Sequence, residues 1–307
     1  MAIPRSWQDR LTLPAISAPM FLISGPDLVV EACNAGVVGS FPALNQRTSE
    51  GFRDWLDEIA GRLQPQAAPF GVNLVVHRSN PRLEADLAIV VERRVPLVIT
   101  SLGLNRELIA AVQAYGGKIF HDVTNLKFAA KAAEAGVDGL IAVTYGAGGH
   151  AGLISPFAAL HEIRRIFDGT LILGGAISTG RQIAAARLMG ADMVYMGTRF
   201  MATAESMAVE RQRRMILDAQ AADIVYTPAV SGVPGNFLRQ SLAEAGRDPD
   251  DLTPPDKLNF GTTDPKAWRD LWAAGQGVGA IDDMPGVAAL VARLRDEYRA
   301  AGSMLAS

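Results

Sequence analysis

A single histidine surrounded by glycines is the clearest candidate for chemistry in this chain. Residues 146–152 read Gly-Ala-Gly-Gly-His-Ala-Gly, and His150 carries the one ring in that run. The run follows an apolar stretch typical of a buried strand, residues 139–144. Glycines let the backbone approach a planar ligand closely. An imidazole at a strand end can act as a base, an acid or a hydrogen-bond donor near neutral pH. The alternative is a loop histidine without a role.

Two further turns have the composition of a phosphate site. Gly174, Gly175 and Ala176 end one apolar stretch, just before a predicted helix start at 178–180, and residues 195–198 (Tyr-Met-Gly-Thr) end the next. Small residues allow backbone N–H groups to approach a phosphate, and the N-terminus of a following helix adds the positive end of its dipole. Tight turns without a ligand use the same residues, but the two turns together favour phosphate binding.

Polar or small residues also occur in two earlier apolar stretches. Asn73 lies within residues 70–76, and Pro19 and Met20 end residues 15–20. A buried amide needs hydrogen-bond partners. Asn73 therefore either points toward the site and binds a polar ring edge, or points away as a structural amide, and both orientations are compatible with the strand pattern.

The elements that would position these residues alternate along the chain. Short, nearly continuous apolar runs, typical of strands buried on both faces, alternate with amphipathic helical segments. The eight predicted strands are residues 15–20, 37–43, 70–76, 97–102, 118–123, 139–144, 170–176 and 193–198. Eight such units in series favour an α/β fold, a closed (β/α)₈ TIM barrel, over an open doubly wound sheet. In this barrel the carboxyl ends of the strands share one mouth, where the loops carry the active site.

The alternation breaks after about residue 220. Residues 226–280 contain six prolines and several glycines, which predicts an inserted cap or lid over the barrel mouth. We therefore expect residues 1–225 to form the barrel and residues 281–307 to form a C-terminal helix that packs on it. The alternative for residues 226–280 is a solvated excursion without a function.

Composition narrows the class of protein. The chain has 307 residues, 49% of them hydrophobic, and a net charge of −3, with no basic stretch typical of a nucleic-acid surface. Cys33 is the one cysteine, so no internal disulfide can form and a cytoplasmic protein is expected. The polar N-terminus lacks the apolar core of a signal peptide, and no run of about 18 apolar residues predicts a membrane span. The scattered histidines do not have the spacing of a metal site.

The motifs together resemble the nitronate monooxygenase family, formerly called 2-nitropropane dioxygenases, over nearly the whole chain. Flavin-type enoyl-ACP reductases and flavin NADH:quinone reductases share much of the pattern. The resemblance rests on Ala18-Pro19-Met20, on Gly-Val-Asn-Leu at 71–74, on Ala-Gly-Gly-His at 147–150, on the turn at 174–176, on Met-Gly-Thr-Arg-Phe at 196–200 and on Ala-Gly-Gln-Gly at 274–277.

This resemblance implies FMN, bound without a covalent link. His150 matches the family's catalytic histidine, and Gly148 would pack close to the flavin. Pro19 and Met20 would lie against the ring, Asn73 would bind the ring or the ribityl chain, and Gln276 would approach from the cap. The phosphate would be held by Gly174, Gly175, Ala176, Gly197 and Thr198, with Tyr195 and Met196 lining that site.

Three residues depart from the family pattern. Gly146 stands where the family often has glutamate, and Ala176 stands where it usually has a second glycine. Asp122 follows the strand-five histidine, His121, where some members carry lysine. The first two changes are mild for FMN binding. The third weakens any transfer of substrate from the quinone reductases that carry the lysine.

The expected reaction is the oxidation of an alkyl nitronate, with O2, to a carbonyl compound and nitrite. The flavin would do the redox work, and the protein would supply position and electrostatics. His150 would stabilise the anionic nitro group or remove the α-proton of a neutral nitroalkane. The alternatives are an NAD(P)H-dependent FMN reductase of enoyl thioesters or quinones, and a non-catalytic barrel that binds a phosphate ligand. A small-molecule substrate and O2 would be the partners, and a homodimer stays an open alternative to a monomer.

Overall fold

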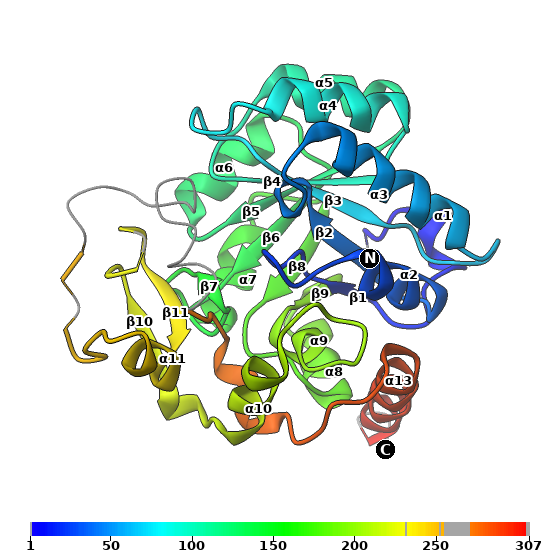
Figure 1. The fold of residues 1–307 in the computed structure, drawn as a ribbon. Helices are drawn as coiled ribbons and strands as arrows, with labels where there is room; N and C mark the ends of the chain where they lie inside the picture. Colours follow the sequence, from blue (N-terminus) through cyan, green and yellow to red (C-terminus); the bar gives the residue numbers. More distant parts are fainter. Residues whose placement is uncertain (1, 231, 252, 255–270, 305–307) are drawn as a thin grey trace.

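The computed structural model describes residues 2–230, 232–251, 253–254 and 271–304. In this part of the chain, eight parallel strands close into a barrel in the order β1-β2-β3-β4-β5-β6-β8-β9 (Figure 1). Their bounds are β1 Ala15–Ser17, β2 Val38–Pro42, β3 Gly71–Val75, β4 Leu97–Ser101, β5 Lys118–Val123, β6 Gly139–Val143, β8 Thr170–Gly174 and β9 Met193–Met196. Each strand lies within a stretch predicted from the sequence, and the (β/α)₈ barrel is confirmed.

Strand residues contribute to two separate cores, one inside the barrel and one under the helices. One cluster fills the barrel, and Trp7 of α1 (Arg5–Gln8) joins it with its ring centroid 5.6 Å from that of Phe120. The strand residues of this cluster are all 0% exposed, namely Ile16, Val38, Leu97, Ile99, Phe120, Ile141, Ile172 and Met193. The intervening residues, such as Val98 and Leu140, pack in the larger cluster between strands and helices. Burial on both faces explains why the strands read as continuous apolar runs.

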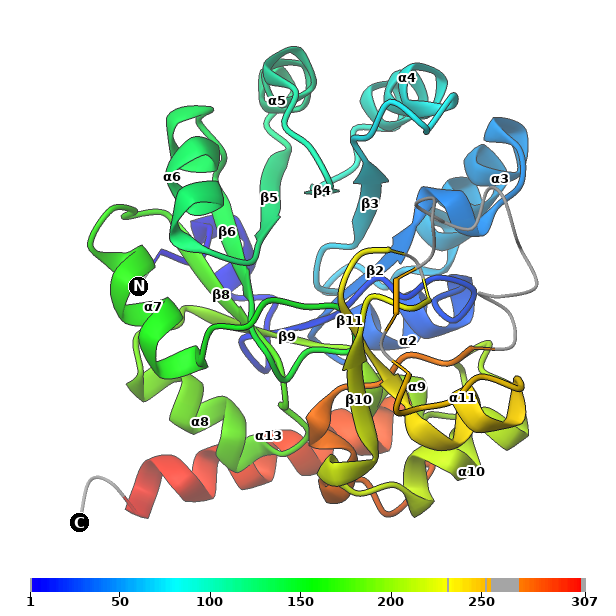
Figure 2. The same cartoon turned by 90° about the vertical axis from the view of Figure 1, so that its left-hand side faces the viewer.

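The helices surround the barrel as an outer ring (Figure 2). Their bounds are α2 Pro26–Asn34, α3 Ser49–Arg62, α4 Leu83–Glu92, α5 Arg106–Ala114, α6 Leu126–Glu134, α7 Pro156–Arg164 and α8 Gly180–Leu188. The last helix, α13 (Val287–Met304), packs against α8 and α2. No helix among the described residues combines the length and apolar character that crossing a membrane requires.

A second, antiparallel sheet stands at the carboxyl end of the barrel. It has the strand order β10-β11-β7, with β10 at Ile224–Thr227, β11 at Gly235–Leu238 and β7 at Gly149–His150. Because β7 follows directly after barrel strand β6, this sheet lies at the mouth, and Figure 2 shows β10 and β11 in front of the barrel strands. Shorter helices lie in the same region, namely α9 Thr198–Met201, α10 Glu210–Asp218, η2 Ala221–Asp223, α11 Arg239–Glu244 and η3 Gln276–Ala280, and η1 Ala43–Asn45 follows β2. The division of the chain at residues 226 and 281 stays a prediction, and part of the predicted cap lies outside the described residues.

Candidate active site

The loop after β6 is bonded to two other segments at the mouth. The Gly146 carbonyl oxygen accepts hydrogen bonds from the N–H of Ala176 at 3.1 Å and from the N–H of Gln276 at 3.0 Å. Gly148 lies tightly against the same segment, since a Cβ at this position would be 2.8 Å from the Gly275 nitrogen. The structure therefore brings three predicted site residues, from three distant parts of the sequence, to one loop.

Asn236 fixes this loop and is not among the residues predicted from the sequence. Asn236 is 0% exposed, and its Nδ2 donates to the carbonyl oxygens of Tyr145 at 2.7 Å and Ala147 at 2.6 Å. It lies on β11, which pairs with β7 and so with His150. The available signal was the Pro-Gly-Asn run at 234–236, but that composition is equally typical of a simple turn.

His150 lies in strand β7, where its backbone pairs with Gly235 of β11, and its side chain is partly buried. Burial lowers the pKa of the His150 imidazole to about 4, because the charged form is poorly solvated there. The imidazole is therefore neutral at pH 7, with one N–H donor and one acceptor nitrogen. An anion placed beside it would favour the charged form and raise this pKa.

The turn after β8 has an unusual backbone. Gly175 has φ +132°, and a Cβ there would lie 2.4 Å from the Thr144 Oγ1, so both the conformation and the packing require glycine. That hydroxyl donates to the Gly174 carbonyl oxygen at 2.8 Å. Ala176 has φ 55°, a left-handed conformation that costs a non-glycine residue about 1 kcal/mol, and it is exposed. The turn thus presents its backbone at the mouth.

The N-terminus of α8 does not offer its first amides to a ligand. Gln182 Oε1 accepts from the N–H groups of Ser178 at 2.7 Å and Thr179 at 3.0 Å. Thr179 Oγ1 accepts from the Gln182 N–H, and Glu297 Oε2 of α13 accepts from the Gly180 N–H at 2.6 Å. A capping box and the last helix therefore already use these amides, and the phosphate site at the turn before them stays a prediction.

The end of β9 lies beside the loop after β1. Pro19 and Met20 are partly buried there, and the nearest atom to a Cβ built on Gly197 is the Met20 Sδ at 3.6 Å. Gly197 therefore leaves space beside the Met20 side chain that a larger residue would fill. Thr198 is bonded to the cap, because its Oγ1 accepts from the Gly275 N–H at 2.9 Å.

Two neighbouring residues of β9 point in opposite directions. Tyr195 is associated with the cluster inside the barrel, and burial raises the pKa of its hydroxyl well above the ordinary value. Met196 is 1% exposed and packs in the outer cluster, under the helices. Its side chain therefore does not line the mouth, contrary to the prediction, and its carbonyl oxygen accepts from the Ala18 N–H at 3.0 Å.

Asn73 points into the barrel. Its neighbours in β3, Val72 and Leu74, pack in the outer cluster, which leaves Asn73 on the opposite face of the strand. Its Nδ2 donates to the Ile99 carbonyl oxygen and to the Ser101 Oγ, both at 3.2 Å. The amide nitrogen is thus used by β4, and the Oδ1 is the atom with acceptor capacity.

Arg199, in the Met-Gly-Thr-Arg-Phe motif, has a structural position. It is 1% exposed, and its Nη1 lies 3.1 Å from the Asp283 Oδ1. Its Nη2 donates to the carbonyl oxygens of Asp283 at 2.9 Å and Ala202 at 3.1 Å. These bonds tie the end of the barrel to the segment that leads into α13. No group of His, Cys, Asp and Glu side chains in the described ranges is arranged to hold a metal ion.

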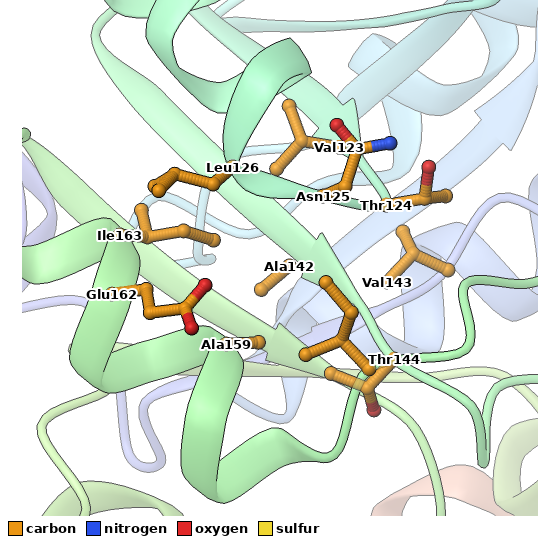
Figure 3. Close-up of a pocket in the computed structure, with 11 residues that line it drawn as sticks. Val123, Thr124, Asn125, Leu126, Ala142, Val143, Thr144, Ala159, Glu162 and Ile163 are labelled. Carbon is orange, nitrogen blue, oxygen red and sulfur yellow. The ribbon is translucent and has the colours of Figure 1, made fainter.

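A small crevice lies on the outer side of the barrel, apart from the candidate site (Figure 3). It is formed between β5, β6, α6 and α7, and its lining includes Leu126, Ala142 and Ile163. Its volume is about 10 Å³, the space of roughly one water molecule. It is too small for a substrate.

The fold is a (β/α)₈ barrel, and the candidate site residues lie at the carboxyl mouth of its strands. A family model described as nitronate monooxygenase matches residues 8–297, and the chain belongs to this family of oxidoreductases. A nitronate monooxygenase of Paraburkholderia phytofirmans is 28% identical over an alignment of 282 positions that covers 77% of this chain and 76% of the relative.

Other similar proteins have different names. A (3aS,4S,5R,7aS)-5-hydroxy-7a-methyl-1-oxo-octahydro-1H-indene-4-carboxyl-CoA dehydrogenase of Mycobacterium tuberculosis is 29% identical over 75% of this chain and 64% of its own length. Among solved structures, a nitroalkane oxidase of Streptomyces ansochromogenes has a TM-score of 0.80 at 26% identity, covering 97% of this chain and 99% of the other. A mutant FabK of Thermotoga maritima has a TM-score of 0.81 at 26% identity, covering 97% and 96%. The family is therefore diverse in its reactions.

Proposed function

We propose that the protein binds FMN at the barrel mouth and oxidises alkyl nitronates with O2 to a carbonyl compound and nitrite. The observation that carries the proposal is the position of His150, a neutral imidazole on β7, at the same mouth as the turns at 174–176 and 197–198. Membership of the nitronate monooxygenase family supports the same reaction class.

The residues at the mouth suit a planar ligand that ends in a phosphate. Gly148 and Ala176 are exposed, and Gly197 leaves space beside Met20. We assign the phosphate to the backbone of Gly174, Gly175, Ala176, Gly197 and Thr198, and the ring and ribityl chain to Pro19, Met20, Asn73, Gly148, Tyr195 and Gln276. Bound there, FMN supplies the redox chemistry, and the chain supplies position and electrostatics.

His150 favours a substrate that is already an anion. An imidazole with a pKa of about 4 is a weaker base than free imidazole, so it removes a proton from carbon slowly. Its N–H still donates a hydrogen bond to a nitro oxygen. A bound nitronate also raises the pKa of the imidazole and so favours its protonated form, whose hydrogen bond to the anion is charge-assisted on both sides. We therefore infer that nitronates are better substrates than neutral nitroalkanes.

A second candidate is NAD(P)H-dependent reduction of an enoyl thioester or a quinone. Large apolar side chains are exposed on loops that follow barrel strands at the mouth, with Phe21 42% and Leu22 36% exposed after β1, and Leu102 39% and Leu104 36% exposed after β4. Such a rim suits an acceptor with a long apolar portion. The relative named as a carboxyl-CoA dehydrogenase acts on a CoA thioester, which supports a thioester as the substrate in this alternative.

Anaerobic mixing separates the two functions. We expect propionate 3-nitronate to bleach the flavin of the purified yellow enzyme, and NADH and NADPH to leave it oxidised. Bleaching by a nicotinamide and not by the nitronate would favour the reductase.

A pair of variants tests the phosphate assignment. Gly175→Leu should fold but lose FMN, because the position has no room for a side chain. Gly190→Leu is the matched control, since Gly190 also has a positive φ, +101°, but has no atom within 4 Å of its Cβ position. Full flavin retention by Gly175→Leu would remove the assignment.

A further inference from the structure

Asp122 is a carboxyl group inside the barrel mouth. It lies in β5 between His121 and Val123, and Val123 packs in the outer cluster, whereas Phe120 packs inside the barrel. Strand alternation places Asp122 on the same inner face as Phe120, one step nearer the carboxyl end. The ring of His121 lies on the other face, where its Nδ1 is 2.7 Å from the Thr100 Oγ1.

One oxygen of this carboxyl group has no partner within the part of the chain that the structure describes. The Asp122 Oδ1 is buried and has no hydrogen-bond partner among the described residues, although the residue as a whole is partly exposed. The Asn73 amide nitrogen is used by Ile99 and Ser101, and Tyr195 is the titratable group whose pKa the Asp122 charge raises. Burial without a partner raises the pKa of Asp122 to about 7.

A buried carboxyl group without a partner is costly, and such groups concentrate at functional sites. Three inward residues at this end of the barrel, Asn73, Asp122 and Tyr195, come from β3, β5 and β9. The Asn73 amide already bonds to β4, and the Asp122 Oδ1 faces the mouth without a partner among the described residues, so a ligand bound there can supply one.

We propose that Asp122 is a flavin-binding residue whose neutral carboxyl group donates a hydrogen bond to the ring system of bound FMN and thereby controls how easily the flavin is reduced. This inference rests on the proposed FMN site. Reduction places negative charge on the flavin, which a neutral donor stabilises and a carboxylate opposes. Ionisation of Asp122 therefore disfavours reduction, and by linkage reduction favours the protonated carboxyl group.

The test measures the equilibrium constant for reduction of the bound FMN against a dye of known potential, between pH 5.5 and 9. Wild type is compared with Asp122→Asn, which keeps a neutral donor at every pH. The matched control is His121→Gln, which changes the adjacent residue whose side chain points the other way. Flavin content and thermal unfolding are recorded for all three proteins.

We expect Asp122→Asn and wild type to have equal equilibrium constants at pH 5.5. At pH 9 the constant of the variant should exceed that of wild type by about tenfold, because one unit charge close to the flavin is worth at least one pKa unit of coupling. His121→Gln should follow wild type at every pH. A ratio that does not change with pH, or an equal change in the control, would overturn the proposal.

An infrared difference spectrum of the FMN-loaded proteins gives a second reading. The C=O stretch of a protonated carboxyl group should be present in wild type at pH 5.5, shift on reduction of the flavin, and be absent from Asp122→Asn. A C=O band whose frequency does not change when the flavin is reduced would place Asp122 away from the ring and refute the inference. A wild-type protein that holds no flavin at all would instead refute the proposed function, and the inference with it.

Discussion

Replacing His150 by alanine should affect two substrates differently. With a neutral nitroalkane, the reaction needs a base for the α-proton, and a positioned proton-transfer group is worth about 10²–10⁴-fold in rate. Burial lowers the pKa of His150 from 6.5 to about 4, which reduces its basicity by a factor of about 300. We therefore expect the rate with the nitroalkane to fall by about 10²-fold, at the lower end of that range. A preformed nitronate has no α-proton to lose, and its rate should fall less.

The pH dependence follows from the direction of the same shift. Because the pKa is lowered, the neutral imidazole that acts as the base is present at all pH values above about 4. The rate on a neutral nitroalkane should therefore be constant, as far as His150 is concerned, from pH 6 to 8, and should fall only as pH approaches 4. With a histidine of ordinary pKa, the rate would already fall below pH 6.5.

The assay is kcat/KM for each substrate, with flavin content measured in parallel. His161→Ala is the control, because His161 lies on α7 and is exposed. Equal losses with both substrates would mean that His150 binds the nitro group and is not the base. Unchanged rates with both would remove its catalytic assignment.

Two substitutions and one labelling experiment test the contacts of the site and the packing of the core. Gly148→Ala should lower FMN affinity about tenfold or more, measured by flavin fluorescence, because its Cβ would lie 2.8 Å from the cap backbone; unchanged affinity would mean that the cap moves freely. Arg199→Ala should reduce the free energy of unfolding by about 1–3 kcal/mol in a denaturant titration, because it leaves the carbonyl groups of Ala202 and Asp283 without their donor, while Arg293 still pairs with the Asp283 carboxylate; a loss under about 0.5 kcal/mol would contradict a structural role. Cys33 should react with a thiol reagent only on unfolding, because burial raises its pKa to about 12, and fast labelling of the native protein would refute this.

The barrel could be predicted because its signal is local. Each strand is buried on both faces, so every strand is an apolar run that a short window reveals. The predicted stretches were longer than the strands where the chain turns into the mouth. Residues 15–20 were predicted, for example, and β1 ends at Ser17, after which Ala18, Pro19 and Met20 form the loop beside Gly197.

The site could be predicted only in part, because most of its order comes from distant contacts. His150 was identified from its glycine neighbours, but nothing nearby in sequence indicates that it belongs to a strand, since its partner is Gly235. Asn236 was missed for the same reason, because its role depends on two carbonyl groups of the loop after β6. Met196 was misplaced because its side-chain direction depends on the strand register, which composition does not specify.

Two residues that depart from the family pattern, Gly146 and Ala176, are distant in the sequence but adjacent in the structure. A Cβ added at Gly146 would lie 2.9 Å from the Cβ of Ala176, closer than two side chains can approach. A side chain at 146 therefore requires glycine at 176, and this chain has the reverse pair. Ala176→Gly alone should raise the free energy of unfolding by about 1 kcal/mol, because it relieves the left-handed alanine.

Gly146→Ala should destabilise the wild-type protein by about 1–3 kcal/mol, through overpacking, and much less in the Ala176→Gly background. A double-mutant cycle on the four proteins measures this coupling, which we expect to be at least about 0.5 kcal/mol. Additive effects would mean that the two positions vary independently. Coupled effects would mean that residues 146 and 176 change together, because only one of them can carry a side chain where the loop after β6 contacts the turn after β8. The hydrogen bond from the Ala176 N–H to the Gly146 carbonyl oxygen would then be the feature that both residue pairs preserve.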